Sequence, residues 1–520
     1  MSGIVPTFSD LSFYTTAAGQ DKRYKSLINL FKEEFDTEPE FLARSPGRVN
    51  LMGDHIDYNK FSVLPMAIDA DVIAAVGCSE DSKVVLVNTD KSFQSEGFEL
   101  PANGAVIEID KAKHTWGNYF KCAMIVAHHY ILEKFPDYVD GGKKPLKGMK
   151  LAFNGSVPTG GGLSSSAAFC VTSTLAILRA NGVKSISKEE LTRITVVSEH
   201  YVGVNTGGMD QCASIYGEKG KTLLVQFKPK LVGIPFDAPL IKPHEMVFLI
   251  SNSLVKANKH ETAPRDYNLR VVEMAISAEM YAKHFGLKLD KDSNVSTGSM
   301  RDFMDKYFEV YLKEDAWDGS DIKIGGKRLN EMLALTEKLF SEKEKEGFTT
   351  SEAAEKIGIS VEEFTETFLS KFPVKYEKLK IYQRSKHVYA EALRVLEVLS
   401  LFQSHSTASD GDSFLREFGR ILNESLRSLD IYNGSVTTEL NELCDISTSN
   451  GAYGARVTGA GFGGSVVHMT TVDKLPNVIK ALKEQYYNKR LPDLSEAELS
   501  EALVVSKPAA GSCYVDLASL

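Results

Sequence analysis

Polar and charged side chains crowd into residues 44–59, which read Arg-Ser-Pro-Gly-Arg-Val-Asn-Leu-Met-Gly-Asp-His-Ile-Asp-Tyr-Asn. Because unpaired buried charge is heavily penalised, we expect a loop shaped by its glycines rather than a core element. The carboxylates and the imidazole suit a ligand with several hydroxyls, and a guanidinium is a permanent cation able to neutralise phosphate. A structural loop held by ion pairs explains the same residues equally well. The side chains in question are Arg44, Arg48, Asn50, Asp54, His55 and Asp57.

A glycine cluster at residues 160–162 precedes three serines and an apolar run, in the order Gly-Gly-Gly-Leu-Ser-Ser-Ser-Ala-Ala-Phe. The backbone N–H groups at the start of such a helix attract phosphate, and glycines let the backbone approach an anion closely. The alternative is an ordinary glycine turn with Ser164 as the helix N-cap. The stretch is not a P-loop, because no Gly-Lys-Ser/Thr follows, and it is not a Gly-x-Gly-x-x-Gly dinucleotide loop.

Asp210 follows a glycine pair in the sequence Gly-Gly-Met-Asp-Gln. A carboxylate beside a flexible turn can orient or deprotonate a substrate hydroxyl, although most aspartates after glycines are simply turn residues. Another glycine-rich segment, Arg456–Ser465, has four glycines within six residues, which is costly in backbone entropy unless a close approach requires them. We expect this segment to shape the site rather than to catalyse.

The elements that must position these residues follow from hydrophobic periodicity. We expect strands at 63–77, 83–88, 148–154, 222–227, 246–251, 502–506 and 512–516, with more strands inside 454–471. We expect helices at 20–36, 116–134, 164–181, 188–203 and 474–487, and a mostly helical part from about 264 to 450. A chain of 520 residues exceeds what one hydrophobic core usually supports, so we expect two domains, residues 1–240 and residues 241–520.

Composition excludes several classes of protein. The net charge is −9 without a long basic run, which argues against a nucleic-acid binder. No stretch approaches the roughly 20 apolar residues of a membrane helix, and no secretory signal is visible, so we expect a cytoplasmic protein. The six cysteines form no Cys-x-x-Cys pair and are expected to be free thiols. Residues 350–370 have helix-turn-helix spacing but carry glutamates, which predicts a solvated helical hairpin.

The motifs together resemble those of a known family. Residues 47–58 are similar to the sugar-recognition signature of galactokinases, Gly-Arg-x-Asn-Leu-Ile-Gly-Glu-His-x-Asp-Tyr, with Met52 in place of isoleucine and Asp54 in place of glutamate. The Gly-Gly-Gly-Leu-Ser-Ser-Ser-Ala loop resembles the nucleotide loop of the GHMP small-molecule kinases. The segment Arg456–Ser465 resembles the third motif of that superfamily. The chain is therefore identified as a member of the fungal-type galactokinases.

The resemblance implies an α/β (α+β) fold of two GHMP kinase domains, with the active site in the cleft between them. It implies transfer of the γ-phosphoryl of Mg²⁺-ATP to the anomeric hydroxyl of D-galactose. The implied catalytic residues are Asp210 and Arg48. The implied sugar-binding residues are Arg48, Asp54, His55, Asp57, Asn205, Gly208, Asp210 and Tyr267. The implied nucleotide-binding residues are Gly160, Gly161, Gly162, Ser164, Ser165, Trp116, Asn258 and Lys259, and Mg²⁺ is assigned to Ser166 and Glu199.

Two alternatives stay open. The first is an N-acetylgalactosamine kinase, whose family shares all three motifs. The second is a galactose sensor that binds sugar and ATP and relieves a transcriptional repressor, with or without catalysis. Sensors of that type have lost a Ser-Ala pair from the phosphate loop, whereas residues 164–168 are intact here, which favours an active kinase. We expect a monomer that binds galactose and ATP, with a possible repressor partner and no nucleic-acid or membrane partner.

Overall fold

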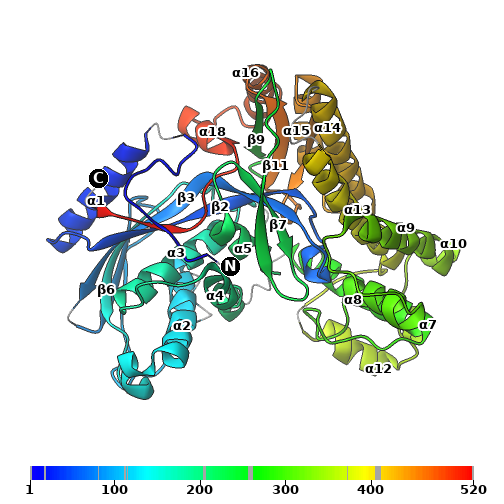
Figure 1. Ribbon diagram of the computed structural model, residues 1–520, viewed down its shortest axis with the longest axis horizontal. Coiled ribbons are helices and arrows are strands. Elements are labelled where there is room, and N and C mark those ends of the chain that lie inside the picture. The colour runs from blue at the N-terminus through cyan, green and yellow to red at the C-terminus, as the bar shows by residue number, and fades with distance from the viewer. Residues whose placement is uncertain are drawn as a thin grey trace.

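The computed structural model describes most of the chain. The described residues are 3–16, 19–79, 81–110, 113, 115–202, 207–255, 262–371, 373–404 and 411–517. Figure 1 shows a large twisted sheet with helices α1, α2 and α3 at one end of the molecule and a mostly helical region at the other. Among the described helices, none is long and apolar enough to cross a membrane.

The larger sheet has seven strands in the order β1-β13-β2-β3-β6-β4-β5. Its strands are β1 (Thr7–Phe8), β2 (Phe41–Met52), β3 (Leu64–Ser79), β4 (Lys83–Asn88), β5 (Glu96–Glu99), β6 (Gly148–Gly155) and β13 (Cys513–Val515). Side chains that alternate along β3 pack into two different apolar clusters, so both faces of the sheet are covered. Helix α1 (Gln20–Phe35) packs on one face, and α2 (Trp116–Lys134) and α3 (Ser165–Ala180) pack with the cluster on the other.

A second sheet of four antiparallel strands has the order β10-β11-β9-β12. Its strands are β9 (Met246–Asn252), β10 (Gly454–Thr458), β11 (Ser465–Thr471) and β12 (Leu503–Ser506). A separate hairpin of β7 (Lys221–Gln226) and β8 (Val232–Asp237) touches the chain before β3 through a bridge between Val63 and Val225. The helices that follow the phosphate loop or flank the second sheet are α4 (Lys188–Thr195), α5 (Met209–Tyr216), α14 (Gly411–Ser428), α15 (Thr438–Ser449), α16 (Leu475–Leu482), α17 (Asn488–Arg490) and α18 (Glu496–Ala502).

The helical region lies at the right of Figure 1, at the opposite end of the molecule from helix α1. It consists of α7 (Tyr267–Phe285), α8 (Met300–Lys306), α9 (Ile322–Leu339), α10 (Glu342–Lys345), α11 (Thr350–Ile357), α12 (Val361–Phe364) and α13 (Ile381–Ser404). Helices α11 and α12 form the predicted helical hairpin, with Thr349 and Ser360 capping their first turns. The helical character expected for this part of the chain is confirmed.

Most expected elements are found within a few residues of their predicted bounds, with two differences. The predicted helix at 188–203 is interrupted, since α4 ends at Thr195 and a 3₁₀ turn, η3 (Ser198–Val202), follows. The predicted loop at 44–59 is wrong over its first half, because residues 44–52 belong to the buried strand β2. All six cysteines are thiols rather than members of disulfides, and five are buried. The division at residue 240 stays a prediction, and β13 from the C-terminus lies in the first sheet.

Candidate active site

Strand β2 buries its charged side chains because each has a partner. Arg44 is fully buried and its Nε lies 2.5 Å from the Asp71 carboxylate, while its Nη1 donates to the carbonyls of Ala510 and Gly511. Two irregularities in the pairing with β3, one on each side of Arg48, re-aim the strand near the site. Buried charge is tolerated when it is paired and hydrogen-bonded. The expectation of a loop assumed unpaired charge, and that assumption fails for this strand because its arginines are paired.

Arg48 joins two parts of the site that are far apart in the sequence. Its Nε donates to Asp210 Oδ1 at 2.8 Å, and its Nη1 donates to the carbonyl of Gly162 at 2.7 Å. Its backbone N–H also donates to the carbonyl of Leu163. The side chain is 6% exposed, and that of Asp210 is 20% exposed. One guanidinium therefore fixes an accessible carboxylate beside the glycine loop.

The glycine loop has the backbone that an anion site requires. Gly160 and Gly162 have φ angles of 73° and 72°, in the left-handed region that favours glycine, and no atom lies within 4 Å of a Cβ built on Gly160. Helix α3 begins directly afterwards, at Ser165. The hydroxyl of Ser164 is buried without a hydrogen-bond partner and does not cap the helix. A buried hydroxyl and unpaired N–H groups at one helix start fit a phosphate group.

The segment Arg456–Ser465 supports this loop, as expected. The hydroxyl of Ser465 donates to the carbonyl of Gly161 at 2.5 Å. A Cβ on Gly459 would lie 2.9 Å from the carbonyl of Gly162, so a side chain there would push the two loops apart. The close approach explains why this segment needs its glycines.

The Asp57 carboxylate lies against the backbone at Gly207 and interacts electrostatically with the carboxylate of Asp210. A Cβ on Gly207 would lie 2.3 Å from Asp57 Oδ2, and Gly208 begins helix α5 with a φ of 96°. Burial, and then the charge of Asp210, raise the pKa of Asp57 to about 6. Burial and the same carboxylates hold the pKa of the Tyr267 hydroxyl well above its usual value, so it remains a hydrogen-bond donor. The cluster offers acceptors and a donor to a polyhydroxylated ligand.

Asp54 and His55 lie at the site, but the protein already bonds their polar atoms. Asp54 is 2% exposed, and its two carboxylate oxygens accept from Asn50 Nδ2 at 2.8 Å and from Arg456 Nη2 at 2.5 Å. Burial lowers the pKa of His55 to about 3, so the ring is neutral. Its Nε2–H donates to the carbonyl of Ala460 at 2.8 Å, and its Nδ1 accepts from the Tyr58 hydroxyl. A ligand at this turn would therefore contact residues whose polar atoms already bond to other parts of the protein.

The residues expected near the nucleotide and Mg²⁺ lie around the start of α3. Trp116 is half-buried, its ring centroid lies 5.8 Å from that of Phe169 in α3, and its Nε1 donates to the carbonyl of Gln94. Glu199 is buried, and its Oε2 accepts from Gln211 Nε2 at 2.8 Å. Burial and the Glu199 charge raise the pKa of the Cys170 thiol, one turn after Ser166 in α3. Glu199 therefore lies beside the first turns of α3.

Not every predicted residue is placed. Asn205, Asn258 and Lys259 lie outside the described residues. Gly161 is buried in the glycine loop, and Ser165 and Ser166 are half-buried in the first turn of α3. Sequence reasoning missed Glu391 and His387 of helix α13, which contact the turn that carries Asp54. No local motif signals them, because they lie more than 330 residues along the chain from that turn.

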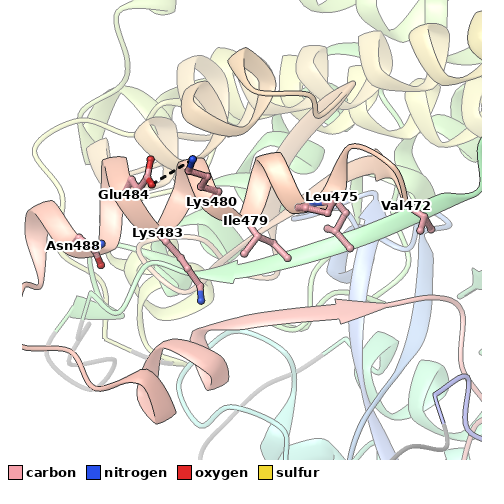
Figure 2. A pocket seen from close by; sticks show the side chains of 8 residues that line it. Val472, Leu475, Ile479, Lys480, Lys483, Glu484 and Asn488 are labelled. Atoms are coloured by element: carbon pink, nitrogen blue, oxygen red, sulfur yellow. Dashed lines mark ion pairs between the residues drawn. The ribbon is translucent and has the colours of Figure 1, made fainter.

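A surface hollow in the described part of the molecule lies elsewhere. It follows helix α16, has a volume of about 530 Å³, and is lined by Leu475, Ile479 and their neighbours (Figure 2). The ion pair of Lys480 with Glu484 lies at one end of it. This hollow lacks convergent buried polar groups, so it is not the candidate active site.

Three stretches of the chain match family models. Residues 29–78 match the galactokinase galactose-binding signature, residues 118–218 the GHMP kinases N terminal domain and residues 412–488 the GHMP kinases C terminal domain. A galactokinase of Schizosaccharomyces pombe is 63% identical over 514 residues, covering 99% of this chain and 99% of that protein. The chain belongs to the galactokinase family.

Further comparisons agree with galactokinase membership. A galactokinase of Candida albicans is 51% identical over 521 residues, covering 98% of each chain. The crystal structure of Lactococcus lactis galactokinase complexed with galactose superimposes with a TM-score of 0.64 at 22% identity, covering 94% of this chain and 99% of that chain. At that identity the likeness concerns the fold, which is the mixed α/β fold of GHMP kinases. The fold class and the family expected from the sequence are confirmed.

Proposed function

We propose that this galactokinase family member transfers the γ-phosphoryl group of ATP to the anomeric hydroxyl of D-galactose, giving galactose 1-phosphate and ADP. The observation that carries the proposal is the bridge made by Arg48. Its guanidinium contacts the Asp210 carboxylate and the Gly162 carbonyl of the phosphate loop at 2.8 and 2.7 Å. A proton acceptor and an anion-binding loop are thus held next to each other, as phosphoryl transfer requires.

In the proposed reaction Asp210 orients the sugar hydroxyl and takes its proton as the oxygen bonds to the γ-phosphorus. The bond between that phosphorus and the β,γ-bridging oxygen breaks, and ADP leaves with the electron pair. Arg48 is an always-charged donor beside the transferring group, where it stabilises the charge that develops on the phosphoryl oxygens. Positioning and electrostatic stabilisation supply most of the rate enhancement in this reaction class.

We assign the sugar to the space beside the carboxylates of Asp57 and Asp210. The ionised Asp57 accepts hydrogen bonds from sugar hydroxyls, Tyr267 donates one, and Gly208 lies beside them at the start of α5. Asp54 and His55 line the same turn, with their protein contacts fixing its shape. Asn205 completes this set as a prediction from the sequence.

We assign the nucleotide to the glycine loop and the start of α3. The unpaired Ser164 hydroxyl and the open space at Gly160 fit the phosphates, with Gly161, Gly162 and Ser165 beside them. Trp116 borders the adenine, and Asn258 and Lys259 stay predicted contacts.

Ser166 and Glu199 would hold Mg²⁺, which neutralises phosphate charge when bound. Mg²⁺ keeps most of its ligands as water and phosphate oxygens, so one or two protein ligands suffice. The cytoplasmic location, the monomeric state and a possible repressor partner stay predictions from the sequence.

The test of this assignment is the Asp210→Asn variant, which keeps the size of the side chain and removes its charge. We expect turnover with galactose to fall by at least ~10²-fold, because a proton acceptor typically contributes that factor or more. ATP binding, measured by calorimetry, should stay within a few-fold of wild type because Asp210 is assigned to the sugar. Turnover equal to wild type would contradict the role of Asp210.

A further inference from the structure

We propose that Glu391 and His387 of helix α13 are positioning residues of the sugar site, holding the turn Gly53–His55 in its binding conformation. The inference rests on the proposed function, since its readout is the affinity for galactose. The two residues are four apart in one helix, so their side chains project from the same face. Through that face, helix α13 of the helical region contacts a turn that belongs to the sugar-recognition signature.

The turn has a backbone that needs outside support. Gly53 has a φ of 106° and His55 has a φ of 64°, and a non-glycine residue in that region is a strained conformation. Helix α13 bonds the backbone on both sides of Asp54 Cα. Glu391 Oε1 accepts from the Gly53 N–H at 3.1 Å, and His387 Nε2 lies 3.0 Å from the carbonyl oxygen of Asp54.

The protonation state of His387 follows from its partners. Burial lowers the pKa of the ring to about 4, so the imidazole is neutral at pH 7. Because a carbonyl can only accept, Nε2 carries the proton and donates to Asp54, while Nδ1 accepts from the Ser428 hydroxyl at 2.8 Å. The Asp54 carbonyl therefore fixes the tautomer, and Ser428 at the end of α14 satisfies the other ring nitrogen.

The second contact is electrostatic. Arg456 Nη2 lies 2.5 Å from Asp54 Oδ2 and 3.5 Å from Glu391 Oε1, so two carboxylates share one guanidinium. Glu391 is fully buried, and its other oxygen accepts from Arg394 Nε at 2.9 Å. Burial alone would raise the pKa of Glu391, but Arg394 and Arg456 hold it at about 2, so the group is ionised.

The shared guanidinium couples helix α13 to the direction of the Asp54 carboxylate. Without the charge of Glu391, Arg456 is drawn toward Asp54 alone, and the Gly53 N–H has a weaker acceptor. The contacts that offset the strain of the turn are then weaker, and His55 shifts with the turn. The nucleotide loop has no contact with Glu391 or His387 among the hydrogen bonds of the described residues, so its affinity for ATP should be preserved.

Three variants test the inference: Glu391→Gln, His387→Ala and His387→Gln. The control is Asp302→Asn on helix α8, a carboxylate that is 2% exposed and paired with Lys228 at 3.1 Å. For each purified protein we would measure kcat, the KM for galactose, the KM for ATP and the thermal unfolding midpoint. The control removes a buried charge of the helical region without touching the turn.

We expect Glu391→Gln and His387→Ala to raise the KM for galactose about tenfold, the factor that one lost hydrogen bond of a buried group corresponds to. The KM for ATP should stay within twofold. His387→Gln should recover part of the galactose affinity, because its amide can still donate to the Asp54 carbonyl. Asp302→Asn should lower the unfolding midpoint and leave both KM values unchanged.

An unchanged KM for galactose in folded Glu391→Gln and His387→Ala would overturn the inference, as would equal increases in both KM values. If Glu391→Gln does not fold, the variants His387→Ala and His387→Gln test the inference by themselves, since they leave the charges around Arg456 in place. If the wild-type protein does not phosphorylate galactose, the proposed function itself is contradicted. The two failures are therefore distinguishable.

Discussion

Arg48 uses two separate edges of its guanidinium, one toward Asp210 and the other toward the Gly162 carbonyl. A lysine ammonium cannot reach both groups with a fixed geometry. We predict that Arg48→Lys lowers kcat for galactose phosphorylation by about 10²-fold, the effect of losing one well-placed donor to a developing charge. Steady-state kinetics measures this loss.

Arg44 provides the matched control for that variant, because it is a buried arginine on the same strand. Arg44→Lys disturbs the pair with Asp71 and should lower the thermal unfolding midpoint, while the folded fraction keeps its kcat. Equal losses of kcat in the two variants would mean that Arg48 acts through strand stability alone.

The Asp57 carboxylate should determine how kcat/KM for galactose depends on pH. Burial and the neighbouring Asp210 raise its pKa to about 6, so its acceptor form is lost as the pH falls through that value. We predict that kcat/KM for galactose is flat from pH 7 to 8 and declines below about pH 6. In Asp57→Asn, kcat/KM should be lower at pH 7 and the decline near pH 6 should be absent. A decline that persists unchanged in the variant would assign it to another group.

At the scale of elements, strand β11 and the glycine loop are joined by one side-chain hydrogen bond. Ser465 Oγ donates to the Gly161 carbonyl at 2.5 Å. We predict that Ser465→Ala raises the KM for ATP about fivefold, from a bond worth about 1 kcal/mol, and leaves the KM for galactose unchanged. Thr470→Ala is the control, because Thr470 on the same strand donates to the Gly451 carbonyl instead. An equal effect in the control would show that strand stability, not the loop contact, sets the KM.

Elements with a strong local pattern could be predicted from the sequence. Helix α2 fills the expected 116–134, and α1 ends one residue short of the expected 20–36. The glycine loop and the start of α3 were also predictable, because glycines and serines have a specific role at a helix start. In these cases the residues that determine the structure are neighbours in the chain.

Strand β2 shows where sequence reasoning stops. Its charges suggested a loop, but Arg44 and Arg48 find partners 27 and 162 residues away. Such pairing is invisible to a local pattern, and it decides whether a charged segment is buried. Glu391 was missed for the same reason, because its contact with Gly53 spans 338 residues of the chain. The sequence thus indicated which motif residues to examine, but not the distant residues that support them, and the roles of the motif residues stay predictions.

At the scale of the whole molecule, the strand nearest the C-terminus, β13, is part of the first sheet. Strand β13 lies between β1 and β2, and Tyr514 at its centre is 2% exposed. The ring of Tyr514 lies under the Arg179 guanidinium at 4.3 Å, and its hydroxyl donates to the Leu175 carbonyl of α3. The last strand therefore ties the sheet to the helix that begins at the phosphate loop.

We predict that Tyr514→Ala lowers the free energy of unfolding by about 3–5 kcal/mol, as for other large aromatic truncations in cores. Tyr514→Phe keeps the ring and should lose only about 1 kcal/mol for the hydrogen bond. Thermal unfolding followed by calorimetry compares the two. A Tyr514→Ala protein as stable as wild type would mean that β13 is dispensable for the first sheet.

The proposed phosphoryl transfer is tested most directly by ADP release from the purified protein with Mg²⁺-ATP. Galactose, N-acetylgalactosamine and glucose would be compared at equal concentrations. We predict rapid ADP release with galactose and little with the other two sugars. Turnover only with N-acetylgalactosamine would contradict the proposed substrate, and tight joint binding of galactose and ATP without ADP release would contradict catalysis itself.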